Sequence, residues 1–425
     1  MVIIVTGPTI TSLHARRRAH LFSSGHSPPT RQIAAENDAL AMLRLMNRAH
    51  AHLGRAPPSA APFQRRHGSH KASDPLRILF CGSDTFSCGS LRALHREHVE
   101  NRALVEALDV MVLPGRRTGR GLKTVREVPC KTLAEQLNLP IHQRETFRNW
   151  EASRPVSLPR GTNLVVVVSF GLFVPPRILK SAKYGGLNVH PSLLPDLRGP
   201  APLHRALLRG DTHVGVSLQT LDDRAFDHGT ILAQSPAPGM PVARGASLQE
   251  VLSAAAAEGA DMLIRGLRDG VHVPPREDVG WKAAELQGTQ LVHAPKITKA
   301  DGQVDWAAWT AEHFGTRLRV LGSVWTHLVS RKGVRKRVIF LDAAPAACAE
   351  GAVLRQSHEA TLVCEHEGAL VGDAGTGRHE ARVMPRPDGS CLIGIRDGSW
   401  IRVGKVKVDG KPEQMAAAGL GSFVR

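Results

Sequence analysis

The chain has 425 residues, of which 42% are hydrophobic, so it can bury a sizeable core in two or three domains. Its 55 Lys and Arg against 38 Asp and Glu give a formal net charge of +17, which favours a polyanionic partner, nucleic acid first and an anionic membrane surface second. The longest apolar run is far shorter than the roughly 20 residues of a membrane span, so we expect no membrane insertion. The six cysteines are scattered, which predicts reduced thiols and no metal site.

The first 75 residues differ from the rest of the chain in charge. They contain ten Arg or Lys but only three acidic residues, and they are rich in Ser and Ala. This composition is typical of an organellar transit peptide and predicts a protein of the mitochondrial matrix. A disordered basic arm is the alternative interpretation of residues 1–75.

Globular character begins at "LRILFCGSDTFSCGSLRAL", which predicts a strand over 76–80, a turn, and a helix from Ser87. Further strands are predicted in "ALDVMVLPG", "LPIHQ", "NLVVVVSFGLFV" and 187–189, and a helix in "CKTLAEQLNL". A helix from Ser247, with Glu250 three residues later, closes this part of the chain. Alternating strands and helices predict an α/β fold with a mostly parallel, Rossmann-like sheet over residues 76–270.

The pattern changes after a linker rich in Pro and Gly at residues 271–290. Short alternating strands follow in "RVIFLDA", "ATLVCEH" and "SCLIGIRDGSWIRVGKVKV", with a hairpin turn at Asp397 and Gly398. They predict a small β-barrel-like (OB-like) domain over residues 291–425. The sequence of residues 350–389 resembles no segment to which we can align it, and we interpret it as an insertion in this domain.

The segment "GLNVHPSLLPDLRGPAP" at 186–202 holds the first candidate site. Asn188 and His190 are two residues apart on a predicted strand, so their side chains point to the same face of the sheet. An Asn amide can donate to an oxyanion and a His can relay a proton, a pair suited to acyl transfer. A carboxylate is still required, and Asp227 is closest to a turn among three downstream aspartates. The competing interpretation of His190 is a hydrogen-bonded core histidine.

These motifs carry a resemblance to a known family. The stretch "NVHPSLLPDLRGPAPLHRALLRGDTHVGVSLQTLDDRAFDHGTILAQ" resembles the folate-dependent formyltransferases, and "LRILFCGSDTF" and "TGRGLK" extend the similarity. The segment "APKITKADGQVDW" and the β-rich C-terminal part resemble the members that act on methionyl-tRNA. The turn after Asp227 reads "DHG", with His228 at a variable position of the family's "D-x-G" motif.

The resemblance implies an enzyme that transfers the formyl group of 10-formyltetrahydrofolate to the α-amino group of methionine on initiator tRNA, in support of organellar translation. It implies catalytic roles for Asn188, His190 and Asp227, and no metal. The folate-binding segment would consist of Ser192, Leu193, Leu194 and Pro195. We expect a monomer whose partners are folate and initiator methionyl-tRNA.

A Gly-rich basic loop, "GRRTGRGLKTVR", fits the second substrate, because a flexible backbone with basic side chains can fold against the phosphates of an acceptor stem. An ordinary solvated loop is the alternative. The predicted tRNA-binding residues are Arg116, Arg117, Arg120, Lys123 and Arg126. A second basic cluster, "SRKGVRKR" at 330–337, is another candidate phosphate contact.

Three other functions remain open at this stage. A formyltransferase of the same fold could act on a phosphoribosyl glycinamide or a nucleotide sugar, although the basic loop and "APKITKADGQVDW" argue against it. A folate-binding hydrolase would release formate. An RNA-binding barrel fused to an inactive α/β domain would catalyse nothing, which the intact set of Asn188, His190 and Asp227 disfavours.

Overall fold

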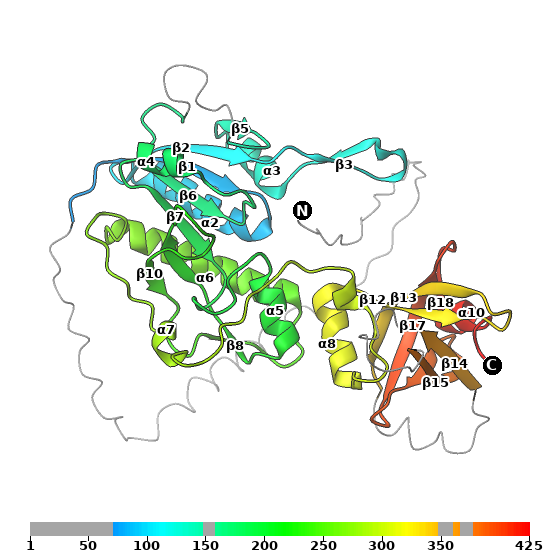
Figure 1. Cartoon of the computed structure of the whole chain (residues 1–425). Helices are drawn as coiled ribbons and strands as arrows, with labels where there is room; N and C mark the ends of the chain where they lie inside the picture. Colours follow the sequence, from blue (N-terminus) through cyan, green and yellow to red (C-terminus); the bar gives the residue numbers. More distant parts are fainter. Residues whose placement is uncertain (1–70, 148–157, 347–359, 366–376) are drawn as a thin grey trace, which may run out of the picture. The chain divides into compact units, whose positions relative to one another are not determined.

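The computed structural model of the chain describes residues 71–147, 158–346, 360–365 and 377–425 (Figure 1). The predicted transit peptide lies outside these residues except for 71–75. Within the described part of the chain, no helix combines the length and the apolar character that crossing a membrane would require.

The first half of the described chain forms a seven-stranded sheet in the order β10-β9-β7-β6-β1-β2-β5. Neighbours from β7 through β5 pair in parallel, whereas β9 runs antiparallel to both β7 and β10. The predicted mostly parallel, Rossmann-like sheet is therefore confirmed. Its strands are β1 (Leu76–Gly82), β2 (Val105–Val112), β5 (Ile141–Gln143), β6 (Leu164–Val168), β7 (Gly186–His190), β9 (Ser217–Thr220) and β10 (Ile231–Gln234).

Helices cover the sheet on both faces (Figure 1). The helices of this half are α2 (Thr85–Glu100), α3 (Pro129–Gln136), α4 (Pro176–Ser181), α5 (Pro202–Arg209), α6 (Leu248–Arg268) and α7 (Lys282–Glu285). Helix α6 begins with the predicted capping box, in which Ser247 and Glu250 bond each other's backbone N–H. Two further short strands, β8 (His213–Val214) and β11 (Met240–Pro241), pair with each other.

Alternate residues of the central strands enter two separate apolar clusters, one on each face. Ile78 and Phe80 of β1 pack in the cluster that includes residues of α2 and α6. Leu79 and Cys81 lie in the cluster on the other face. In β7, Leu187 and Val189 belong to the α2 and α6 side. The intervening Asn188 and His190 therefore project from the opposite face, as their spacing predicts.

The buried strand predicted over "NLVVVVSFGLFV" is shorter than expected. Strand β6 ends at Val168, and Ser169 has a φ of +47°, a left-handed conformation that strand residues do not adopt. The chain leaves the sheet at this point and reaches α4 through Pro175, which precedes the helix. Residues 169–175 are therefore a loop.

The second half of the described chain contains the predicted β-barrel, which confirms the fold class. Its sheet runs β13-β12-β14-β15-β16-β17-β18, and the additional pairing of β13 with β17 closes the ring. Its elements are η2 (Ala300–Gly302), α8 (Ala311–Leu321), β12 (Val324–Val329), β13 (Arg335–Pro345), β14 (Ala360–Glu365), β15 (Arg378–Pro385), β16 (Cys391–Gly394), β17 (Trp400–Val408), β18 (Glu413–Met415) and α10 (Ala416–Leu420).

The interpretation of residues 350–389 as an insertion is wrong in part. Strands β14 and β15 fall within this segment and belong to the closed ring. Leu362 and Cys364 of β14, with Ala381 and Val383 of β15, alternate into the apolar core of the barrel. Residues 350–359 and 366–376 lie outside the described residues.

Candidate active site

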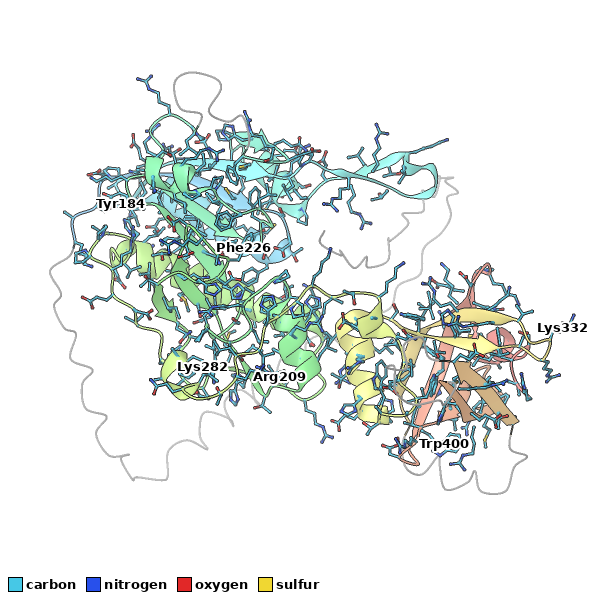
Figure 2. The ribbon with its side chains drawn as sticks, in the orientation of Figure 1. Tyr184, Arg209, Phe226, Lys282, Lys332 and Trp400 are labelled. Atoms are coloured by element: carbon cyan, nitrogen blue, oxygen red, sulfur yellow. The ribbon has the colours of Figure 1, made fainter. Side chains whose placement is uncertain are left out.

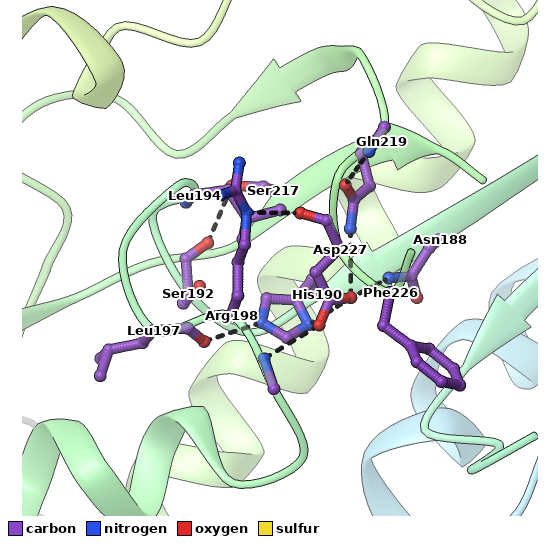
Figure 3. Close-up of polar contacts among 12 residues, drawn as sticks. Asn188, His190, Ser192, Leu194, Leu197, Arg198, Ser217, Gln219, Phe226 and Asp227 are labelled. Carbon is purple, nitrogen blue, oxygen red and sulfur yellow. Dashed lines mark hydrogen bonds and ion pairs between the residues drawn. The ribbon is translucent and has the colours of Figure 1, made fainter. Parts of the chain in front are cut away.

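Asn188 and His190 both lie on strand β7, which pairs with the antiparallel strand β9 (Figure 3). The register places Asn188 opposite Gln219 and His190 opposite Ser217. Side chains of directly opposed residues lie on the same face of a sheet. The site is therefore built on the face of the sheet at the junction of a parallel and an antiparallel pair.

His190 is buried, with 6% of its surface exposed. Its Nε2 lies 3.1 Å from the carbonyl oxygen of Leu197. A carbonyl oxygen only accepts hydrogen bonds, so Nε2 carries a hydrogen and donates it. The other ring nitrogen, Nδ1, lies 3.5 Å from Oδ1 of Asp227. The backbone thus fixes the tautomer of His190 and leaves Nδ1 facing the carboxylate.

Asp227 lies in the connection between β9 and β10, which folds back over Asn188 and His190. Its Oδ1 accepts a hydrogen bond from Nδ2 of Asn188 at 3.2 Å, and its Oδ2 accepts one from the backbone N–H of Gly199 at 2.9 Å. The Nε of Arg198 donates to the Asp227 carbonyl oxygen at 2.8 Å. The structure thus brings together the three residues that the sequence selected as catalytic.

The predicted folate-binding residues follow directly after β7. Ser192 and Leu194 are almost fully buried, and their polar groups are used within the fold. The Ser192 hydroxyl donates to the Asp196 carbonyl oxygen at 2.8 Å, and the Leu194 N–H donates to the Ser217 hydroxyl at 3.1 Å. The peptide bond between Leu194 and Pro195 is cis. Ser192 and Leu193 also line a cavity of about 410 Å³, together with Arg209 and Lys282.

A second cavity, of about 310 Å³, adjoins the turn that carries Asp227. Its wall includes Asp222 and Asp223, which precede Asp227, and His228 and Gly229, which follow it. The cavity also has Lys180 in its wall. The backbone N–H groups of Arg224 and Ala225 both donate to Asp222 at 2.8 Å, and they hold the pKa of this carboxyl below its usual value.

An aromatic pair lies beside this turn. Phe226, labelled in Figures 2 and 3, directly precedes Asp227 and leaves 58% of its surface exposed. Its ring meets the edge of Phe173 from the loop after β6, with 5.2 Å between centroids. Ligand pockets combine apolar and aromatic side chains with a few polar groups, as Phe226 and the partly buried Asp227 do here.

The basic segment at 116–126 is not the flexible loop that its glycines predict. It forms a hairpin of β3 (Arg116–Thr118) and β4 (Thr124–Arg126), joined through η1 (Arg120–Leu122). Gly119 and Gly121 have φ values of +79° and +75°, so the glycines serve to close this turn. The exposed residues are Arg116, Arg117, Lys123 and Arg126. Arg120 is the first residue of η1, in the turn between β3 and β4.

The register of the hairpin sets two like charges against each other, because Arg116 pairs directly with Arg126. Directly opposed like charges destabilise a two-stranded pair unless an anion lies close to both. An anion placed close to both arginines would relieve this repulsion.

Groups of three or more His, Cys, Asp and Glu suited to a metal ion are not found among the described residues. Sequence reasoning missed the backbone N–H of Gly199 as a partner of Asp227. The glycine itself was a partial signal in the sequence, since a glycine lets the backbone approach another group closely. In the structure, a Cβ at position 199 would lie 2.6 Å from the Ala294 carbonyl oxygen. It also missed Gln219, which only the strand register identifies.

Comparison with known proteins shows the family of this chain. The sequence model of the family described as formyl transferase matches residues 76–266. The mitochondrial methionyl-tRNA formyltransferase of Bos taurus is 34% identical over 59% of this chain, and the chain spans 58% of that protein. The mitochondrial methionyl-tRNA formyltransferase of Saccharomyces cerevisiae is 31% identical over 67% of this chain and 80% of its own length.

A bacterial relative is equally similar. The methionyl-tRNA formyltransferase of Cereibacter sphaeroides (strain KD131 / KCTC 12085) is 33% identical over 66% of this chain and 85% of that protein. Residues 76–266, which the family model matches, contain both the seven-stranded sheet and the candidate active site. The chain belongs to the methionyl-tRNA formyltransferases of the formyl transferase family.

Proposed function

We propose that this protein transfers the formyl group of 10-formyltetrahydrofolate to the α-amino group of methionine esterified to initiator tRNA. The observation that carries the proposal is the convergence of Asn188 and His190 on the carboxylate of Asp227. The names of the relatives, which are methionyl-tRNA formyltransferases, support this choice of substrate.

The three side chains have distinct parts in the proposed reaction. The amine attacks the formyl carbon, and the carbonyl oxygen gains negative charge. The Asn188 amide has one N–H bonded to Asp227 and a second that can donate to this oxygen. In this proposal His190 is protonated and held through Nε2, and its Nδ1 donates a hydrogen bond to the same oxygen. The ammonium proton leaves through water to Asp227, and a proton returns by the same route to the folate nitrogen as its bond to the formyl carbon breaks.

An assay with three products tests this function. The purified chain is incubated with 10-formyltetrahydrofolate and methionyl initiator tRNA, and formyl-methionine on tRNA, free formate and formylated glycinamide ribotide are quantified. We expect formyl-methionyl-tRNA as the main product. Formate alone would identify a hydrolase, and formylation of the ribotide, added as a competing acceptor, would identify a different member of the fold.

We propose that the pteridine ring of the donor enters the cavity of about 310 Å³, because residues on both sides of Asp227 form its wall. Ser192, Leu193, Leu194 and Pro195 remain the alternative donor segment, at the cavity of about 410 Å³. Each cavity has one lysine in its wall, Lys180 in the first and Lys282 in the second. Either ammonium could attract the anionic glutamate tail of the folate.

Charge reversal at these lysines distinguishes the two cavities. Lys180→Glu is expected to raise the KM for the donor about tenfold at saturating tRNA, which corresponds to about 1.4 kcal/mol, with kcat within twofold. Lys282→Glu is the matched variant for the other cavity, and its donor KM should stay within twofold. The reverse result would move the donor to the side of Ser192 and Leu193.

We propose that the hairpin carrying Arg116, Arg117, Arg120, Lys123 and Arg126 binds tRNA phosphates. The double variant Arg116→Gln, Arg126→Gln is expected to raise the KM for tRNA and to reduce the slope of log KM against log salt by about two, one for each lost contact. Arg265→Gln, an exposed arginine on α6, is the control. An unchanged salt slope in the double variant would exclude the hairpin as a phosphate contact.

We further propose that the protein acts in the mitochondrial matrix, with residues 1–75 as its transit peptide. The Arg-rich, acid-poor composition of this segment and the mitochondrial relatives support the proposal, while similar bacterial relatives exist as well. A reporter fused to residues 1–75 is expected to enter mitochondria, and the same segment with Arg16, Arg17 and Arg18 changed to Glu is expected to stay in the cytosol. If both fusions stay in the cytosol, residues 1–75 are a basic arm and not a transit peptide.

A further inference from the structure

We propose that Gln219 is a positioning residue for formyl transfer. Its side-chain amide connects the carboxylate of Asp227 to the backbone at Gly229 and so holds this carboxylate against Asn188 and His190. The inference rests on the proposed function and adds to it a residue that acts through Asp227.

The register of β9 against β7 brings the side chain of Gln219 to the site. It lies directly opposite Asn188 in the antiparallel pair with β7, on the same face of the sheet. Only 1% of its surface is exposed. A buried primary amide is costly unless its donors and its acceptor find partners, so a glutamine at this position requires specific contacts.

The orientation of the amide follows from its two contacts. The backbone N–H of Gly229 donates to Oε1 of Gln219 at 3.2 Å. Because a backbone N–H can only donate, this contact assigns the oxygen to the side of Gly229. The NH₂ group then faces Asp227, with Nε2 at 3.4 Å from Oδ1 (Figure 3). One side chain thus contacts the turn both at Asp227 and two residues beyond it.

The turn needs such support because its backbone is strained. Asp227 has a φ of +60°, a left-handed conformation that costs a residue other than glycine on the order of 1–3 kcal/mol. Oδ1 of Asp227 is shared by Asn188, His190 and Gln219. Without the amide of Gln219, the carboxylate loses one of its donors, and the turn loses one of the contacts that hold it to β9.

Two variants separate positioning from simple structural support. Gln219→Met keeps the length of the side chain and removes both contacts. We expect kcat to fall about 10- to 100-fold, by analogy with the loss of hydrogen-bond partners that orient metal ligands, with the KM values within threefold. We also expect the acidic limb of the kcat/KM profile to move to higher pH, since the Asp227 carboxylate has lost a donor.

Gln219→Glu gives the opposite pH trend. Near neutral pH, a second carboxylate beside Asp227 repels it, and activity should fall at least as far as in Gln219→Met. When protonated, the Glu side chain can again donate to Asp227 while it accepts from Gly229. The activity of Gln219→Glu relative to the wild type should therefore rise as the pH falls, whereas that of Gln219→Met should decrease.

Gln234→Met on the neighbouring strand is the matched control. Gln234 is also partly buried and bonded through its amide, to the Leu194 carbonyl oxygen and the Ser217 hydroxyl, both at 2.9 Å, but not to Asp227. Its removal can lower stability, but it should leave the acidic limb in place. Parallel pH profiles for all three variants, or a full kcat in Gln219→Met, would overturn the inference. The wild-type enzyme in the same assay tests the proposed function separately, because its failure would appear as absent formyl transfer.

Discussion

His190→Ala is expected to lower the rate of formyl transfer by at least about 10³-fold, and Asn188→Ala by about 10²- to 10³-fold. Asn188 can supply one donor to the developing oxyanion, and the loss of one such donor has this magnitude in other acyl-transfer sites. In the proposed mechanism His190 is protonated and supplies both a donor and a positive charge next to Asp227, so its loss should be larger.

The measurement is a single-turnover rate at saturating donor and tRNA, with the dissociation constants of both substrates determined separately. We expect both constants to stay within about threefold, because the proposed binding elements are the cavity beside Asp222 and the basic hairpin. His98→Ala is the control, since Nδ1 of His98 lies 3.0 Å from the carbonyl oxygen of Val105, the first residue of β2. A normal single-turnover rate in either variant would remove that residue from the mechanism.

Gly229→Ala is expected to damage the site without touching a reacting group. A Cβ at position 229 would lie 1.7 Å from the carbonyl oxygen of Thr220, far inside the contact distance of the two atoms. The backbone cannot yield easily there, because Thr220 N–H bonds the Thr230 carbonyl oxygen at 2.9 Å. The turn must move away from β9 and carry Asp227 with it.

A displacement of about 1 Å can cost about 10²-fold in rate, so we expect kcat to fall at least about 100-fold. The free energy of unfolding should fall by about 1–3 kcal/mol, the usual cost of overpacking. Both are measured on one sample, by formyl transfer and by urea denaturation. Gly394→Ala in the barrel is the control, since its Cβ would meet neighbours only at 3.5 Å and beyond. Wild-type turnover in Gly229→Ala would mean that the turn tolerates the shift.

Much of the fold follows from local patterns in the sequence. The alternation of Leu187, Asn188, Val189 and His190 correctly predicts which two side chains leave the core, because a strand alternates its faces regardless of its neighbours. The cap of α6 is equally local, since Ser247 and Glu250 are three residues apart. Such features require no knowledge of the tertiary structure.

The features that sequence reasoning missed depend on which strands pair and in which register, and local patterns do not determine either. Gln219 contacts Asp227 only because β9 runs antiparallel to β7 in one register, and a shift by one residue would turn its side chain to the other face. The hairpin at 116–126 was predicted as a flexible loop, since its glycines and arginines indicate a turn and charge but not strand pairing. Strand β14 was predicted from "ATLVCEH", but it was placed with β15 in an insertion, because no sequence pattern shows that β14 pairs with β12 and so joins the ring.

The left-handed backbone of Asp227 narrows the choice of amino acid at this position to almost one. Two conditions apply to it independently. The proposed reaction calls for a carboxylate, which admits Asp and Glu, whereas the backbone tolerates Gly, Asn and Asp far better than longer side chains. Aspartate is the one natural residue that meets both conditions. No single substitution of Asp227 therefore keeps both the negative charge and the left-handed backbone. Replacing Asp227 by another residue requires the conformation of the whole turn to change as well.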